Sequence, residues 1–525
     1  MRKILIDKEK KYDLLCYAIL AVSAIFILLI YSYETSPLFG SAQHGMDAIQ
    51  YKAAGKRLID GYVPFKDFFQ QKGVTFFYIQ ALGEWICRLL DNPRIGTFLL
   101  QIVNLIVILV FMYDVAKKLL NKNVTGSGLL RVVALGSMLP ALFIYVSATL
   151  SGNTTEEFSM PYNIISVWLC AKYLIGIDED DSESYTHKPV YALIHSVLFS
   201  FAFWIRPNNC IGVCTSVAFI VLVLLIKKKY KNLFQNAGMF LLGFAGSSVL
   251  FLSYYIFNDA LYDVWYCQFA VNVGYISANS STDAGFLLPL ILCALYALYM
   301  LVVKRKDFLF SLLCAVTSLA MLLMYLIIGS QYAHYCAFVM IAVFLFTVSV
   351  IRNISVVSIK RIFCLQIMIP CILFCGCSYR YVKHIYGNTS YMITIASRAV
   401  KGEYDKVSNA ERIAEKVKGI IPDDSQSDVY VYPPNTDSYK IYYYSDTYSF
   451  FKYTCPGWYE QMGSPETAEL FYEALYENSP EYIIVNDNPT RVAAYEYSEQ
   501  TESFIESDYT LIFEDVDFRL YKLNK

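Results

Sequence analysis

Long apolar runs constrain this chain more than any other feature of its sequence. Stretches of 18 or more mostly apolar residues recur through the first three-quarters of the 525 residues, and each can cross the hydrocarbon core of a bilayer as a helix. Of all residues, 56% are hydrophobic and only 17% are charged, which is unusual for a soluble domain. The sequence therefore predicts a polytopic α-helical membrane protein. By length there are about eleven candidate spans, at 13–33, 95–116, 129–149, 160–176, 190–206, 209–226, 234–257, 286–303, 308–328, 333–351 and 361–378.

Residues 73–90 are apolar enough to suggest one more span, but the distribution of basic residues among the loops of the whole chain argues against it. Short cytoplasmic loops collect Lys and Arg, and Glu84 and Arg88 inside the segment are costly in lipid. We therefore expect 73–90 to be an interfacial helix on the outer surface, within an outer region at 34–94. Every strongly basic loop then lies on the cytoplasmic side with the basic N-terminus: 117–123, 227–232, 304–307 and 352–361.

The chain changes character after residue 378, where it becomes polar, acidic and rich in Tyr. Strand-like runs alternate there with helix-like stretches, which is typical of a small α/β domain. We expect a transmembrane domain at 1–378 and an extracytoplasmic α/β domain at 379–525, in the cell (plasma) membrane. The expected strands are at 428–433, 481–486 and 509–523, and the expected helices at 407–419 and 465–477.

Cysteine usage and charge exclude several kinds of protein. Most of the 14 cysteines lie in apolar runs, where Cys packs as a small hydrophobe, and their spacing predicts neither a disulfide framework nor a zinc site. The net charge is −2, and nucleic acid is not an expected partner. The sequence has no Gly-rich phosphate loop and no Asp-x-Asp in the first outer loop. We predict no cofactor and lean toward metal independence, with a divalent ion as the open alternative.

Polar residues that could act on a charged lipid gather in the expected outer regions. The first outer loop carries Asp47 and Lys72, the loop 151–161 carries Glu156 and Glu157, and Arg206 ends the fifth span. A carboxylate can deprotonate or orient an acceptor hydroxyl. Cations can neutralise a phosphate leaving group. These residues therefore favour chemistry on a lipid-linked phosphate at the outer surface.

The arrangement resembles the GT-C membrane glycosyltransferases, in particular the bacterial branch related to protein O-mannosyltransferases and to the lipid A aminoarabinose transferase. The resemblance rests on an Asp followed by "YKAAGKRLIDGYVPFKDFFQQKG", on "NPRIGTFLLQIVNL" after the interfacial helix, on "NTTEEFSMP", on "WIRPNN" and on the C-terminal domain. At the level of sequence pattern it covers about the first 335 residues. Three features depart from the family: no acid adjoins Asp47, both prolines of its Lys-Pro-Pro are missing after Lys72, and the second-loop acid is Glu rather than Asp.

The resemblance implies a reaction and a role for each site residue. A hexosyl or pentosyl group would pass from a polyprenyl-phosphate donor to an acceptor on the outer face, which is a cell-envelope glycan, a lipid or a protein. Asp47 would be the catalytic base or would position the acceptor. Glu156 or Glu157 would bind the sugar or the acceptor. The donor phosphate would be held by Lys72, Arg206, His334 and Tyr335. The implied partners are the polyprenyl-phosphate-linked sugar, the lipid bilayer and the acceptor.

Each of these residues also has a simpler interpretation. Asp47 precedes a helical stretch, and Asp is favoured as a helix N-cap. Lys72 and Arg206 could anchor span ends at the interface, although the charge rule disfavours an outer Arg. Thr154 and Glu157 have the spacing of a capping box. For all of these residues the structural and functional interpretations stay open at the level of sequence.

Two other functional classes remain as alternatives to an enzyme. A transporter or flippase for a lipid-linked glycan would show interrupted helices and often an internal repeat, and no repeat stands out here. A non-catalytic scaffold that presents the C-terminal domain would have the same sequence features if Asp47 were only a cap. Transfer activity of a folded Asp47→Asn variant separates the enzyme from the scaffold.

Overall fold

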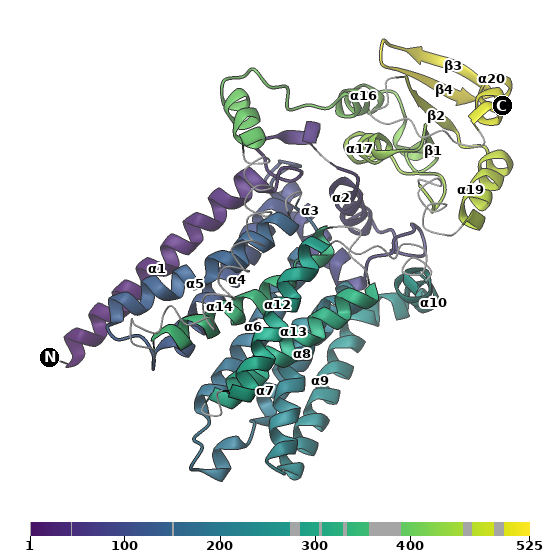
Figure 1. Cartoon of the computed structure of the whole chain (residues 1–525). Helices are drawn as coiled ribbons and strands as arrows, with labels where there is room; N and C mark the ends of the chain where they lie inside the picture. Colours follow the sequence, from purple (N-terminus) through teal and green to yellow (C-terminus); the bar gives the residue numbers. More distant parts are fainter. Residues whose placement is uncertain are drawn as a thin grey trace.

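A bundle of long apolar helices forms the body of the molecule, and a small α/β unit lies at one end of it (Figure 1). The structure is a computed structural model, and it describes residues 2–43, 45–149, 152–273, 284–303, 307–328, 333–355, 390–454, 465–487 and 498–524. We call the end of the bundle that carries the α/β unit the domain end. The long helices of the bundle are α1 (Arg2–Tyr31), α4 (Gly96–Leu120), α5 (Ser127–Ala148), α6 (Thr155–Gly176), α7 (Pro189–Ile205), α8 (Ile211–Ile226), α9 (Tyr230–Phe257), α12 (Ala284–Val303), α13 (Phe308–Ile328) and α14 (Val339–Ser355).

Eight segments of the described chain are long and apolar enough to cross a membrane, which confirms the predicted class of polytopic membrane protein. Leu287–Val302 is a shorter apolar helix. Helix α6 is not among the eight, and its first half carries buried polar residues such as Ser159 and Asn163. The span expected at 361–378 lies outside the described residues. Helix α14 is the innermost of the eight, since 83% of its span is buried, against 22% for α1 and α9.

Two helices that are not among these spans lie between the bundle and the α/β unit (Figure 1). They are α2 (Met46–Ile59) and α3 (Val74–Leu89), which pack against each other. Helix α3 coincides with the segment expected to be interfacial, and it has only 16 residues. The remaining short helices are η1 (Gly40–Gln43), η2 (Ser182–Tyr185), η3 (Pro207–Cys210), α10 (Leu261–Trp265), the π-helical η4 (Tyr266–Ala270), η6 (Ala333–Cys336) and η8 (Asp423–Ser425).

The α/β unit contains one mixed four-stranded sheet in the order β1-β2-β4-β3. Strands β1 and β2 are parallel, and β4 runs antiparallel to both β2 and β3. Every strand lies where the sequence predicts one, with the run 509–523 folded as a hairpin. The strands are β1 (Val429–Tyr432), β2 (Tyr482–Asn486), β3 (Tyr509–Glu514) and β4 (Phe518–Leu523), and the helices are α16 (Asn409–Val417), α17 (Thr436–Ser445), α19 (Pro465–Asn478) and α20 (Ser498–Asp508).

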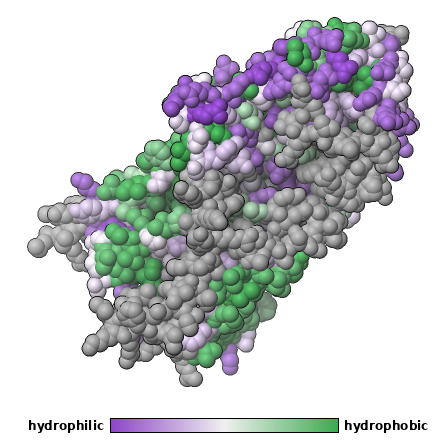
Figure 2. All heavy atoms as spheres, turned by 45° about the horizontal axis from the view of Figure 1, so that its top comes forward, coloured by the Kyte–Doolittle hydropathy of each residue, from purple (hydrophilic) through white to green (hydrophobic). Residues whose placement is uncertain are grey.

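Helix α17, which the sequence analysis did not predict, joins the α/β unit to the bundle. Its N-cap Asn435 forms a capping box with Ser438, which starts the helix firmly. It packs along α2, where Tyr439 and Tyr443 cover Ile49. Figure 2 shows hydrophilic side chains over the α/β unit and hydrophobic ones over the bundle, on the coloured part of that face. The unit therefore contacts α2 and, through Tyr443 and Glu84, also α3.

Candidate functional site

The predicted site residues come from five separate elements that converge at the domain end. Asp47 lies in the first turn of α2, and Lys72 precedes α3. Glu156 lies in the first turn of α6, Arg206 caps the end of α7, and His334 and Tyr335 form part of η6. His334 lies within electrostatic reach of Glu156, Asp47, Lys72 and Arg206. Six predicted residues therefore share one site, although almost 290 residues separate the first from the last in the sequence.

A buried ion pair between Arg206 and Glu156 forms the centre of this site. Arg206 Nη1 lies 3.2 Å from Glu156 Oε1, and the two residues are 5% and 0% exposed. The Thr155 hydroxyl donates to the other carboxylate oxygen of Glu156 at 2.9 Å. Arg206 is extended because Pro207 follows it, so α7 stops there and the guanidinium is free to turn toward α6. A buried arginine paired in this way does not serve as an interfacial anchor.

Lys72 reaches the same site through a close backbone approach at Gly73. The Gly73 N–H donates to the Ile205 carbonyl at 2.9 Å, and a Cβ on Gly73 would lie only 2.0 Å from the Trp204 carbonyl oxygen. Only glycine permits this approach. Lys72 itself is 5% exposed, with its Nζ 5.8 Å from the centre of the Tyr51 ring. The interpretation of Lys72 as a snorkelling anchor is therefore wrong, and its charge acts on Glu156 instead.

A tyrosine ring lies beside each of the two cations, Tyr335 beside Arg206 and Tyr51 beside Lys72. The Arg206 guanidinium lies 4.3 Å from the centre of the Tyr335 ring, a stacking geometry that favours a cation. His334 packs edge-on against the same tyrosine, with ring centres 4.6 Å apart. Tyr51 is fully buried next to Phe76. The Tyr51 phenol lies within electrostatic reach of Asp47, Tyr335, Glu156 and Arg206, so it belongs to the same site although the sequence analysis did not select it.

Asp47 is not the N-cap of α2, contrary to its simpler interpretation. The N-cap is Gly45, and its own side chain can supply no cap. The carboxylate of Glu34 takes this role from outside the helix, since it accepts hydrogen bonds from the backbone N–H groups of Gly45 and Ala48. A Cβ on Gly45 would meet the Glu34 carboxyl group, so a larger residue there would displace the Glu34 side chain. Asp47 is thus left half-buried beside the site, where its negative charge favours the helix N-terminus.

Glu34 is the main site residue that the sequence analysis missed. Burial and the nearby charge of Asp47 raise the pKa of Glu34 to about 8, so the carboxyl is largely protonated at neutral pH. Lys440 of α17 also acts on Glu34, which brings the α/β unit within reach of the site. One sequence signal could have revealed Glu34: it is an acid immediately after an apolar span, where a charge is costly.

The structure separates the roles of Glu156 and Glu157. The Glu157 backbone N–H donates to the Thr154 hydroxyl, so Thr154 caps α6 as its sequence suggested. The Glu157 carboxylate accepts from the Asn153 backbone N–H at 2.9 Å and from the Gln101 side-chain amide at 2.8 Å. Glu157 therefore fixes the loop before α6 against α4. In a full capping box its carboxylate would accept from the backbone N–H of the cap residue Thr154, but here it accepts from that of Asn153. Glu156, in contrast, faces the cations.

The site is a cluster of cations, carboxyl groups and aromatic rings, most of which are buried. Lys72 and Arg206 can bind one anionic group together, because both act on Glu156. Asp47 is a carboxylate that can accept a proton from a bound hydroxyl. Among the described residues, no group of three or more His, Cys, Asp or Glu side chains is arranged to hold a metal ion. The arrangement suits binding of an anionic head group next to a general base.

Comparisons with known proteins connect this arrangement with solved structures. No family model and no curated protein sequence matches the chain. The crystal structure of ArnT from Cupriavidus metallidurans bound to undecaprenyl phosphate superposes with a TM-score of 0.52 at 10% identity, covering 96% of this chain and 97% of that one. The apo structure of the same protein gives 0.53 with the same coverage.

A third similar structure is the archaeal oligosaccharyltransferase AglB from Archaeoglobus fulgidus, in complex with an inhibitory peptide and a dolichol-phosphate. It gives a TM-score of 0.49 at 11% identity, covering 91% of this chain and 69% of that one. The resemblance to GT-C membrane glycosyltransferases is confirmed at the level of fold: this chain has the fold of ArnT over nearly its whole length.

Proposed function

We propose that the protein is a membrane glycosyltransferase that moves a hexosyl or pentosyl group from a polyprenyl-phosphate donor to an acceptor. The observation that carries the proposal is the convergence of Lys72, Arg206, Glu156 and Asp47 around His334 at the domain end. The fold shared with ArnT supports it, because that protein was crystallised with undecaprenyl phosphate. A site with two cations beside a carboxylate suits a lipid phosphate next to an activated hydroxyl.

The proposed reaction assigns one task to each group. The acceptor hydroxyl oxygen attacks the anomeric carbon of the sugar while its proton passes to Asp47. The bond between that carbon and the phosphate oxygen breaks, and the lipid phosphate leaves with the electron pair. Lys72 and Arg206 stabilise the negative charge on this leaving group. Glu156 orients Arg206, and Tyr335 and His334 lie beside the phosphate.

The proposal includes an orientation in the membrane. The domain end lies on the outer face of the cell membrane, the N-terminus is cytoplasmic, and the chain divides into a transmembrane domain at 1–378 and an extracytoplasmic domain at 379–525. The basic loops support this orientation. An exterior-active reporter fused after Thr155 is expected to be active, and the same reporter after Gly126 or Lys229 inactive. The reverse pattern would place the site on the cytoplasmic side and would contradict the proposal.

Two measurements on the purified protein in lipid nanodiscs test the chemistry. The first is binding of undecaprenyl phosphate, which we expect to weaken at least about tenfold in Lys72→Met, or roughly 1.4 kcal/mol. The second is release of undecaprenyl phosphate from a panel of undecaprenyl-phosphate hexoses and pentoses, with membrane extract as the source of acceptor. We expect Asp47→Asn to abolish this release but to retain lipid binding.

Asp67→Asn is the matched control for both measurements. Asp67 lies between α2 and α3, as Lys72 does. Its carboxylate accepts a hydrogen bond from the Val63 backbone N–H at 2.6 Å, so Asp67→Asn should keep transfer activity. Undiminished release by Asp47→Asn would remove that residue from the mechanism. The wild-type protein could also bind undecaprenyl phosphate but release none of it from any sugar donor. That result would contradict the assignment as an enzyme and would favour a flippase or a scaffold.

A further inference from the structure

A polar cavity lies between helices α2 and α3 and the α/β unit. Its volume is about 860 Å³, within the range of small-molecule sites. One wall comes from the C-terminal ends of α2 and α3, and the other from α17 and the segments around it. Asp47 lies at the opposite end of α2, roughly 14 Å along the helix axis from Lys56 and roughly 20 Å from Asp60, which both line the cavity. This cavity is therefore distinct from the site around Asp47.

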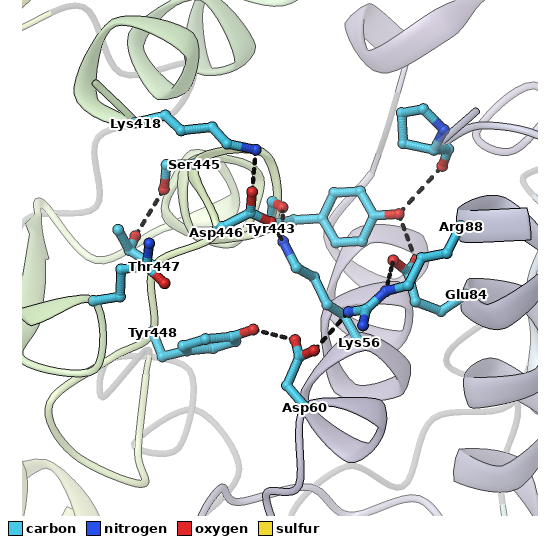
Figure 3. A network of polar contacts seen from close by, with 12 residues as sticks. Lys56, Asp60, Glu84, Arg88, Lys418, Tyr443, Ser445, Asp446, Thr447 and Tyr448 are labelled. Atoms are coloured by element: carbon cyan, nitrogen blue, oxygen red, sulfur yellow. Dashed lines mark hydrogen bonds and ion pairs between the residues drawn. The ribbon is translucent and has the colours of Figure 1, made fainter. Parts of the chain in front are cut away.

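A network of ion pairs fixes the floor of this cavity (Figure 3). Lys56 and Lys418 both reach the carboxylate of Asp446. Arg88 donates to Asp60 at 2.7 Å, and Tyr443 donates to Glu84 at 2.8 Å. The cations that line the cavity are thus already matched by carboxylates, so they offer no spare positive charge to a ligand.

The remaining charge in the cavity is negative. The walls carry five carboxylates and three cations, which leaves an excess of two negative charges. The excess corresponds to Asp91 and Asp423, which lie on opposite walls and are both exposed. The described ion pairs include neither residue, and the Asp423 side chain accepts only a hydrogen bond from Gln426, at 2.9 Å. A phosphate or carboxylate ligand would be repelled here.

Tyrosines supply the rest of the recognition surface. Tyr62, Tyr444 and Tyr448 line the cavity, and the Tyr448 hydroxyl is held by Asp60. Tyr62 and Tyr444 are partly exposed, and each combines an apolar ring with a polar hydroxyl. Exposed carboxylates accept hydrogen bonds from hydroxyl or ammonium groups. Tyrosine rings close to the exposed carboxylates of Asp91 and Asp423 suit a ligand that has apolar C–H surfaces and many hydroxyl or amino groups.

We propose that this cavity binds a glycan that carries hydroxyl or amino groups but no phosphate or carboxylate. This inference rests on the proposed function and extends it, since the glycan would be the part of the acceptor that lies away from the reacting hydroxyl. Asp91 and Asp423 hold it from opposite walls, and the tyrosines support its sugar rings. The position of the cavity at the far end of α2 lets one extended acceptor occupy both sites.

Three hexasaccharides test the proposed ligand class on the full chain in nanodiscs. They are the glucosamine hexamer, its neutral N-acetylated counterpart and a carboxylated hyaluronan fragment, each titrated by calorimetry. We expect saturable binding of the glucosamine or the N-acetylated hexamer, and at least about tenfold weaker binding of hyaluronan. The double variant Asp91→Asn with Asp423→Asn should weaken the favoured hexamer by about tenfold or more. Glu506→Gln, an exposed acid on α20, is the matched control and should bind normally.

The outcomes separate this inference from the proposed function. Asp47→Asn should bind the hexamers as the wild-type protein does, whether or not it transfers sugar. Equal or tighter binding of hyaluronan, no saturable binding of either uncharged or amine-bearing hexamer, or unchanged binding by the double variant would each overturn the inference. A melting temperature of the double variant equal to that of the wild type ensures that lost binding reflects lost recognition. If it melts earlier, the two single variants replace it and are judged by the same criterion.

Discussion

At the scale of single residues, the pair formed by Arg206 and Glu156 joins α7 to α6 inside the protein. Removing one partner of a buried pair leaves an uncompensated charge and costs roughly 3–5 kcal/mol. We expect Glu156→Gln to lower the free energy of unfolding by about this amount, measured by denaturant titration in detergent. Glu183→Gln is the control, since Glu183 pairs with Lys229 on the surface at 79% side-chain exposure and should cost less than about 1 kcal/mol. Equal losses in both variants would contradict the buried-pair argument.

Glu34 gives a prediction about pH, because its pKa is raised from 4.5 to about 8 by burial and by Asp47. A carboxyl that is easier to protonate in the folded state stabilises the fold fully below pH 4.5, and this stabilisation is lost as the pH rises through 8. We expect the melting temperature of the wild-type protein to fall between pH 5 and 9 more steeply than that of Glu34→Gln. Glu506→Gln should follow the wild-type curve. Parallel curves for the wild-type protein and Glu34→Gln would show that Glu34 is ionised at neutral pH.

At the scale of elements, the contact between α2 and α3 depends on one glycine. A Cβ on Gly55 would lie 2.5 Å from the carbonyl carbon of Gln80, so the two helix backbones approach too closely for any side chain. We expect Gly55→Ala to destabilise the protein by about 1–3 kcal/mol through overpacking. Gly136, on the surface of α5, has nothing within 4 Å of a Cβ. Gly136→Ala should therefore be neutral or stabilising by about 0.5–1 kcal/mol, and destabilisation by both variants would refute the close-approach argument.

At the scale of the whole molecule, Lys56 helps to hold the α/β unit against the bundle. Its ammonium donates to the Tyr443 carbonyl at 2.5 Å and pairs with Asp446, and both partners belong to α17 or its C-cap. We expect Lys56→Met to raise amide hydrogen exchange in α17 by about tenfold, with no change in the bundle. Lys416→Met is the control, because Lys416 pairs with Asp515 inside the unit. Unchanged exchange in α17 would show that the apolar contacts of α2 and α17 alone maintain the docking.

Much of the fold follows from local sequence signals. Long apolar runs predicted the eight membrane-length segments of the described chain. Alternating patterns predicted helices α16 and α19 and three strand runs, the last of which folds as the two strands β3 and β4. Helices α17 and α20 were missed. In α17, the run "YKIYYY" is rich in a residue that favours strands. It folds as a helix because Asn435 caps it and because its tyrosines pack on α2, and neither cause can be recognised before the partner helix is known.

The sequence by itself determined the class of the protein, the character of its two parts and most of the candidate site. Apolar length, the bias of basic residues and isolated acids near span ends are local properties, and the cost of burying charge in lipid makes them readable. Only the tertiary structure decided that Glu34 caps α2 in place of Asp47, that Glu156 rather than Glu157 faces the cations, and that Lys72 and Arg206 meet through Gly73. These are contacts between distant segments. They depend on how helices approach one another in space, and spacing along the chain carries no information about that approach.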